Sequence, residues 1–92
     1  MISLDDIIGM TGLTEEEIAA IGEHEHMDLA PSAALADYLM HQHRGPQQIQ
    51  TMICDDIREA LHRDDLNHAR TLFAALRHFM GEHGEAARNV DP

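Results

Sequence analysis

Residues 46–82, PQQIQTMICDDIREALHRDDLNHARTLFAALRHFMGE, decide the fold of this chain. Apolar residues recur three or four positions apart through the stretch, which is the spacing of one face of an α-helix. Arg63 and Asp64 interrupt the pattern, and Asp is a common helix N-cap. We therefore predict helices over about 46–62 and 65–82, joined as an antiparallel hairpin. The residues predicted to face inward are Ile49, Met52, Ile53, Ile57, Ala60 and Leu61, then Leu66, Ala69, Leu72, Phe73, Leu76, Phe79 and Met80.

Three shorter helices are predicted before this hairpin. Ser3 with Asp6, and Thr14 with Glu17, have the spacing of capping boxes, in which each pair satisfies two backbone N–H groups at a helix start. Ser32 is a third candidate cap. The expected helices cover residues 4–10, a stretch from Thr14 to about His26, and 32–43. The last is expected to carry on one side Leu35, Tyr38, Leu39 and His43.

No segment alternates between apolar and polar residues as a β-strand does. The predicted fold is all-α, with five short helices packed around the C-terminal antiparallel hairpin. One domain is expected over residues 1–84 and a flexible tail over 85–92. A chain this small buries only ~60–65% of its unfolded surface, and it has only three aromatic residues. The core is therefore thin, and a core shared between copies would stabilise it.

The charge of the chain excludes several classes of partner. Seventeen Asp and Glu against six Arg and no Lys give a net charge of −11, and residues 1–45 alone carry −8. Such a surface repels phosphate, so we expect neither nucleic acid nor an anionic membrane as a partner. The absence of Lys excludes a Schiff-base or P-loop lysine. Cys54 is the only cysteine, which excludes an intrachain disulfide.

The sequence predicts a soluble, cytoplasmic protein. No apolar run approaches the ~18 residues of a membrane span. The first five residues lack the positive charge that begins a signal peptide. A single cysteine also fits a reducing compartment.

Histidine is unusually abundant, with eight residues, and the most unusual string is Glu23-His24-Glu25-His26. Glu23 and His26 have the Glu-x-x-His spacing by which helices of di-iron bundles present a carboxylate and an imidazole to a metal. Such ligands suit Zn, Mn or Fe. The candidate ligands of a divalent transition metal are therefore Glu23, His24, Glu25 and His26, completed by His68 or by a second copy of the chain.

The same string has a plainer interpretation, as a polar helix end with a histidine near the C-terminal dipole. If Ile18 and Ile21 mark the side that faces the core, Glu25 falls on that side, whereas Glu23 and His26 point away from it. A metal would then lie at the surface or at a contact between subunits.

Asp56 is a second unusual residue, because it lies near the apolar face of its helix. A buried carboxylate is unfavourable unless it is paired. We therefore expect it to contact Arg63, Arg70, Arg77 or a backbone N–H, in a structural role.

Two stretches of the chain resemble known kinds of protein. Residues 4–18 resemble the short helix, Thr-Gly-Leu turn and second helix of helix-turn-helix DNA readers. The second helix begins with three Glu and carries no basic residue, so we interpret the pattern as helix packing without DNA binding. Residues 12–40, through positions 14–18, 20–21 and 23–26, resemble small uncharacterised bacterial all-helical proteins. That resemblance implies a helical fold and no activity.

The sequence favours a small, non-enzymatic binding or assembly protein that forms a homodimer, with metal binding as the alternative. Glu and His pairs perform acid–base chemistry, but no nucleophile with a base and no cofactor motif is present. Protonation of all eight histidines would bring the net charge from −11 to −3, so association in mild acid is a further hypothesis. The predicted contact surface comprises Met27, Leu29, Leu35, Leu39 and Met40.

Overall fold

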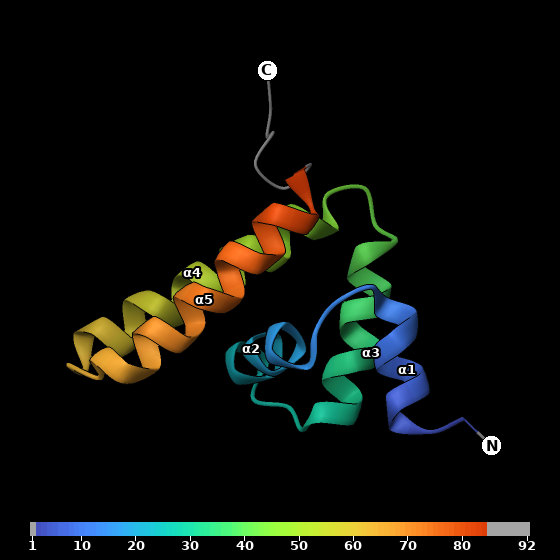
Figure 1. Ribbon diagram of the computed structural model, residues 1–92, viewed down its shortest axis with the longest axis horizontal. Coiled ribbons are helices and arrows are strands. Elements are labelled where there is room, and N and C mark those ends of the chain that lie inside the picture. The colour runs from blue at the N-terminus through green and yellow to red at the C-terminus, as the bar shows by residue number, and fades with distance from the viewer. Residues whose placement is uncertain (1, 85–92) are drawn as a thin grey trace.

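The computed structural model describes residues 2–84 and is all-helical over them, with no β-strand in that range (Figure 1). The predicted all-α class is confirmed. Every predicted helix except the third agrees with the observed bounds to within one residue at either end. The tail predicted over 85–92 lies outside the described residues. The helices are α1 (Leu4–Thr11), α2 (Glu15–Glu25), α3 (Leu29–Met40), α4 (Gly45–His62) and α5 (Leu66–Glu82).

Helix α3 begins and ends three residues before its predicted range. Ser32 is not its cap but a buried residue in its first turn, where the hydroxyl donates a hydrogen bond to the Asp28 carbonyl oxygen at 2.7 Å. Pro31 is tolerated there because the first turn of a helix has no internal partner for its N–H groups. The side that was predicted to carry four residues of this helix is only partly correct. Leu39 is 5% exposed and Leu35 packs against the core, whereas Tyr38 is 61% exposed and His43 is also exposed.

Both predicted capping boxes are present. The Ser3 hydroxyl accepts the Asp6 N–H at 3.1 Å, and the Asp6 carboxylate accepts the Ser3 N–H at 3.2 Å. Thr14 and Glu17 make the same reciprocal bonds at 3.1 and 2.8 Å. Between them Gly12 ends α1 with φ 76°, a left-handed conformation that glycine adopts without strain.

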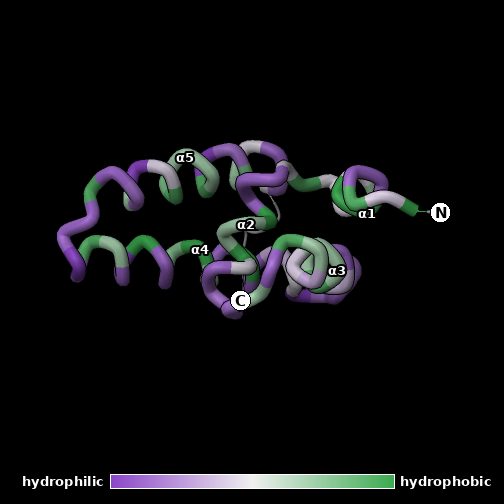
Figure 2. Tube along the Cα trace, turned by 90° about the horizontal axis from the view of Figure 1, so that it is seen from below, coloured by the Kyte–Doolittle hydropathy of each residue, from purple (hydrophilic) through white to green (hydrophobic). Residues whose placement is uncertain are grey.

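Helices α4 and α5 lie side by side, and the chain reverses between them at residues 63–65 (Figures 1 and 2). We call this pair the hairpin. Helix α2 packs against both of its helices and against α3, whereas α1 packs against α3. The molecule measures 42 × 34 × 20 Å along its principal axes. No helix among residues 2–84 is long and apolar enough to cross a membrane.

The link of the hairpin differs from its prediction by one residue. Asp65, not Asp64, caps α5, and its carboxylate accepts the His68 N–H at 3.2 Å. Asp64 adopts φ 59°, and the Asp65 N–H then bonds the Ala60 carbonyl at 2.9 Å to close the end of α4. Asp tolerates this left-handed conformation better than most residues with a side chain.

The core that joins α2 to the hairpin is aliphatic, with one aromatic ring. Ile18 and Ile21 of α2, Ile49 and Ile53 of α4, and Phe79 of α5 are each 0% exposed and belong to one cluster. Side chains of this size stabilise a fold by about 1.5–3 kcal/mol each when fully buried. This cluster is therefore the main source of adhesion between α2 and the hairpin.

The predicted inner face of the hairpin is only partly correct. Leu61, Leu66 and Phe73 are 50%, 53% and 52% exposed, although their spacing predicts burial. A pair of helices has two faces, and α2 is too small to cover both. These three side chains remain at the surface.

Three contacts between carboxylates and imidazoles also tie α2 to the hairpin. In each of them, one partner lies on α2 and the other on α4 or α5. The joined atoms are Glu17 Oε2 and His78 Nδ1 at 2.7 Å, Glu23 Oε1 and His68 Nε2 at 2.6 Å, and Asp55 Oδ2 and His24 Nε2 at 3.3 Å.

Among the three contacts, the one between Glu17 and His78 has the most buried carboxylate. The Glu17 side chain is 1% exposed, and its second oxygen accepts the Thr14 N–H in the capping box. The hydrogen bond to Glu17, and then its negative charge, raise the pKa of His78 above its ordinary 6.5. The charged imidazole is therefore the form that this contact stabilises.

Gly45, the first residue of α4, has no room for a side chain. A Cβ at this position would overlap the backbone carbonyl of Leu39, at the end of α3. Backbone atoms cannot move aside as the end of a flexible side chain can. The glycine therefore permits a close approach of the start of α4 to the end of α3.

We predict that Gly45→Ala lowers the free energy of unfolding by about 1–3 kcal/mol, the usual effect of overpacking. Gly81→Ala is the matched control, because no atom lies within 4 Å of a Cβ placed on Gly81 in α5. That control should raise stability by about 0.5 kcal/mol through helix propensity. Urea denaturation followed by circular dichroism measures both, and changes of the same sign would contradict the steric explanation.

Candidate functional site

The five residues predicted as metal ligands lie at the end of α2 and in the first turn of α5. Helix α2 ends at Glu25, and His26 takes a left-handed conformation with φ 59°. Because His26 leaves the helix, it does not share a helical face with Glu23 as the Glu-x-x-His spacing requires. The expectation for Glu25 is also wrong, since it is exposed, whereas Glu23 is half-buried and contacts His68.

His24 lies between two carboxylates. Its Nδ1 is 2.8 Å from Glu25 Oε2, and its Nε2 is 3.3 Å from Asp55 Oδ2. The other Asp55 oxygen accepts a hydrogen bond from Arg58 at 2.9 Å. Burial disfavours the charged imidazole, but the hydrogen bonds to Glu25 and Asp55 outweigh it and raise the pKa of His24 above 6.5. Both ring nitrogens are engaged, so a metal would have to displace a carboxylate.

The predicted ligands form pairs and do not converge on one point. Within residues 2–84, no three His, Cys, Asp or Glu side chains are placed so that they hold a metal ion. Glu23 is engaged by His68, and His24 by Glu25 and Asp55. Metal binding therefore remains a prediction, and it requires these side chains to rearrange or a second copy of the chain to contribute.

Asp56 is a buried carboxylate. It is 6% exposed on α4, and its Oδ2 has no hydrogen-bond partner among the described residues. Its burial was expected from the sequence, but no ion pair with Arg63, Arg70 or Arg77 forms in the part of the chain that the structure describes. Burial, and then the negative charge of Glu23, raise the pKa of Asp56 to about 6. An ionised carboxylate here is unfavourable at neutral pH.

Asp56 lines a hollow of about 410 Å³ between the end of α2 and the face of α4. Four of its seven lining residues are acidic, and Arg63 is the one residue of the seven with a permanent positive charge. The Arg63 guanidinium lies 3.7 Å from the Glu59 carboxylate. We call this hollow the acidic pocket, and it is lined by Glu23, His24, His26, Asp55, Asp56, Glu59 and Arg63.

The sequence marks Glu23, His24, His26 and Asp56 as unusual, but it does not predict their association in one pocket. Asp55, Glu59 and Arg63 were not among the predicted site residues. Asp55 and Glu59 are four residues apart and so lie on one face of α4, and Arg63 follows four residues later, directly after the helix ends. That spacing could have indicated these residues. Which helix covers that face depends on tertiary packing, which local spacing does not contain.

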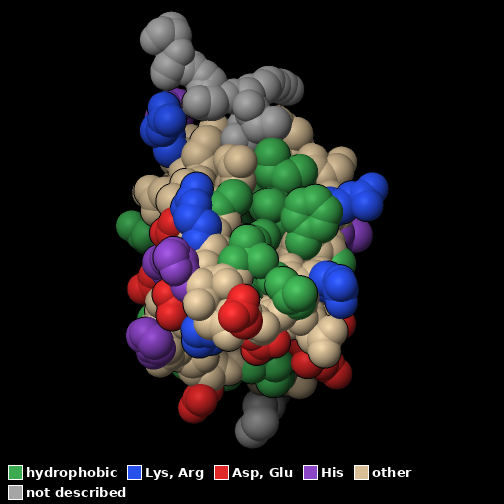
Figure 3. Space-filling view, turned by 90° about the vertical axis from the view of Figure 1, so that its left-hand side faces the viewer, with side chains coloured by type: hydrophobic (Ala, Val, Ile, Leu, Met, Phe, Trp, Pro, Cys, Tyr) green, Lys and Arg blue, Asp and Glu red, His purple; other side chains and the backbone are tan. Residues whose placement is uncertain are grey.

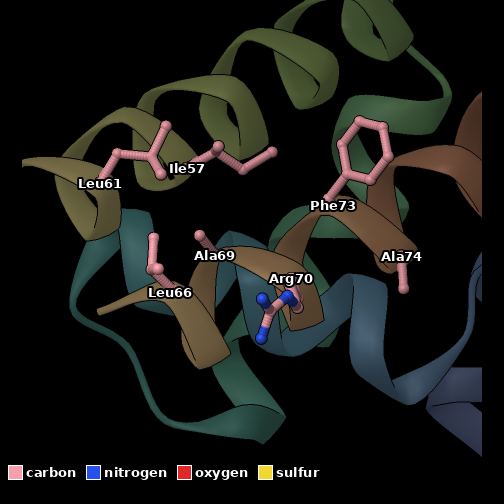
Figure 4. A pocket seen from close by; sticks show the side chains of 7 residues that line it. All are labelled: Ile57, Leu61, Leu66, Ala69, Arg70, Phe73 and Ala74. Atoms are coloured by element: carbon pink, nitrogen blue, oxygen red, sulfur yellow. The ribbon is translucent and has the colours of Figure 1, made fainter. Parts of the chain in front are cut away.

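A second, apolar hollow of about 330 Å³ lies on the hairpin (Figure 4). Seen from the end where the hairpin turns, hydrophobic side chains gather on one face and Arg side chains lie on either side of them (Figure 3). We call this hollow the apolar groove, and it is lined by Ile57, Leu61, Leu66, Ala69, Arg70, Phe73 and Ala74.

The apolar contact surface predicted from the sequence is wrong. Leu39 is 5% exposed, and Leu29, Leu35 and Met40 are partly buried against the core. Of that set only Met27, at 41%, is well exposed. Helix α3 uses these side chains to pack against its neighbours. Exposed large apolar side chains also occur outside the hairpin, Met10 of α1 among them, but those that line the apolar groove are Leu61, Leu66 and Phe73.

We predict that Asp56→Asn raises the free energy of unfolding by on the order of 1–2 kcal/mol at about pH 8, because it removes an unpaired buried charge and keeps the shape. Asp56 has a folded pKa of about 6 and an ordinary value of 3.8. The ionised Asp56 therefore lowers the free energy of unfolding fully above pH 6, and this effect fades as the pH falls towards 3.8. The free energies of unfolding of wild type and variant should converge at about pH 4.

Asp55→Asn is the control for this substitution, because it removes a neighbouring charge that is paired with His24 and Arg58. It should not stabilise the protein. Urea denaturation at both pH values measures these effects, and a destabilised Asp56→Asn at the higher pH would overturn the assignment of Asp56 as an unpaired charge.

Comparisons with known proteins identify no relative of this chain. No family model matches it, and neither a curated protein nor a solved structure matches it significantly. A function must be inferred from the acidic pocket and the apolar groove themselves.

Proposed function

We propose that this chain is a small, non-enzymatic assembly protein that forms a homodimer through the apolar groove of its hairpin. The exposure of Leu61, Leu66 and Phe73 carries the proposal, because each is about half exposed in one continuous groove. Monomeric proteins rarely leave large contiguous apolar patches in water unless those patches bind something. In this proposal the hairpin is also the scaffold around which the other helices pack.

A second copy of the same chain fits this groove in size. A face of two packed helices of about 17 residues measures roughly 26 × 18 Å. The product is roughly 470 Å², little more than half of the ~800 Å² that each partner contributes to a standard interface. The expected dimer is therefore weak and depends on concentration.

A second copy also fits the groove in chemistry. A two-fold axis places the same patch of both copies in contact, so that apolar side chains meet apolar side chains. Arg70 lines the groove, and its guanidinium donates a hydrogen bond to Asn67 Oδ1 of the same chain at 3.3 Å. The partner copy has a surplus of carboxylates, since the net charge is −11.

We predict that Phe73→Gln weakens dimerisation by more than about tenfold. Half of a Phe side chain is about 100 Å², worth ~2.5 kcal/mol at ~25 cal/mol per Å², and the substitution acts twice in a symmetric dimer. Tyr38→Gln is the matched control, because Tyr38 is an exposed ring on α3 outside the groove, at 61% against 52% for Phe73. It should leave association unchanged.

Sedimentation equilibrium across micromolar concentrations measures this association. The wild type should pass from 10.3 kDa towards twice that mass as its concentration rises. A wild type that stays monomeric at high micromolar concentration, or a Tyr38→Gln variant as impaired as Phe73→Gln, would contradict the proposal. The same series at lower pH tests whether histidine protonation strengthens association.

Transition-metal binding is the second candidate function. It is favoured by one observation, that the pairs Glu23–His68 and His24–Asp55 both lie at the same end of α2. Zn, Fe or Mn would have to replace the contacts within these pairs. Elemental analysis of protein purified without chelator tests this candidate, and the absence of stoichiometric metal together with no thermal shift on adding ZnCl₂ would exclude it.

A further inference from the structure

We propose that the acidic pocket binds the primary ammonium group of a linear alkyl amine, with the Asp56 carboxylate as its acceptor. The carboxylate lines the pocket, yet its Oδ2 has no hydrogen-bond partner among residues 2–84. The torsion that orients an Asp carboxyl group is soft, so a small rotation presents either oxygen to the pocket. Because Oδ2 is buried in the present conformation, this rotation is what brings an acceptor without a partner to a donor that enters the pocket.

The walls of the pocket favour a cation. Glu23, Asp55 and Glu59 surround Asp56, and the four carboxylates exceed the single Arg63 by three charges when the histidines are neutral. Part of this charge is already compensated by neighbouring side chains, since Glu23 is paired with His68 and Asp55 with Arg58. His24 and His68 attract the Asp56 carboxylate only through their charge. Among the acids that line the pocket, Asp56 is the one with a buried oxygen to which no described residue donates a hydrogen bond, so it gains the most from an added donor that carries positive charge.

An ammonium group suits the pocket better than a bare metal ion or a guanidinium. The described side chains provide no set of three ligands for a metal. One unpaired oxygen suits a compact point charge, whereas a guanidinium is best matched by two parallel acceptors. The volume of about 410 Å³ leaves room for an alkyl chain beside the charged group.

The acidic pocket and the apolar groove share no lining residue. Amine binding therefore does not depend on the proposed dimer, and each proposal fails separately. Phe73→Gln should bind the amine as the wild type does.

The test is calorimetric titration of the full chain with 1,4-diaminobutane at low ionic strength and about pH 7.5, where the amine is protonated and Asp56 is ionised. We expect saturable binding with one amine per chain. Asp56→Asn should weaken it at least about tenfold, because a charge-assisted hydrogen bond is lost. Glu59→Gln, at the rim of the pocket, should weaken it by about twofold to fivefold.

Asp37→Asn is the matched control, because it removes one carboxylate of α3 that does not line the pocket. It should change the affinity by less than about twofold. Asp56→Asn is expected to be at least as stable as the wild type, so its loss of binding would not reflect unfolding.

Three results would overturn the proposal. The first is the absence of saturable binding of the diamine. The second is an equal loss of affinity in Asp37→Asn and Asp56→Asn, which would mean that the net charge of the protein alone attracts the diamine. The third is stoichiometric binding of ZnCl₂ that excludes the diamine and depends on Glu23 and His68, which would assign the end of α2 to a metal. Binding of 1-aminobutane with the same dependence on Asp56 would support the proposal, since one ammonium group is what it requires.

Discussion

The attachment of α2 to the hairpin is the constraint on which the rest of the structure depends. Ile18 and Ile21 supply the apolar contact, because they are completely buried in the same cluster as Phe79. Apolar contact is not directional, so it does not by itself fix how α2 lies. The three contacts between carboxylates and imidazoles supply that orientation. They also create the acidic pocket, because they hold the end of α2 over the face of α4 that carries Asp56.

The same contacts give the chain a pH dependence of definite sign. The folded pKa values of His24 and His78 are raised, so their stabilisation is complete below 6.5 and is lost as the pH rises through the folded values. Asp56 acts in the same direction, because its raised pKa makes the folded state less favourable as the pH rises towards 6. The excess of carboxylates also destabilises the compact state at neutral pH, because like charges repel one another. We therefore expect mild acidification to stabilise this fold, in contrast to proteins whose paired carboxylates have lowered pKa values.

Much of the secondary structure could be predicted from the sequence, because it rests on local chemistry. Capping boxes and apolar spacing located the helices to within a residue, apart from α3, where a buried serine was mistaken for a cap. Tertiary choices could not be predicted in this way. Spacing placed Phe73 on the apolar side of its helix but did not reveal that α2 covers only part of that side. It placed Glu17 in a capping box but gave no sign that His78 contacts the same carboxylate from α5.

A charged contact between Glu17 of α2 and His78 of α5 holds α2 on the hairpin. Titration of the His78 imidazole by NMR tests it most directly. Glu17→Gln removes the charge and preserves the capping box, which accepts Gln as well as Glu. Glu16→Gln removes a neighbouring charge as the control. We expect the pKa of His78 to lie above 6.5 in the wild type, to fall towards 6.5 in Glu17→Gln, and to move little in Glu16→Gln. A wild-type value at or below 6.5, or equal shifts in the two variants, would contradict the account.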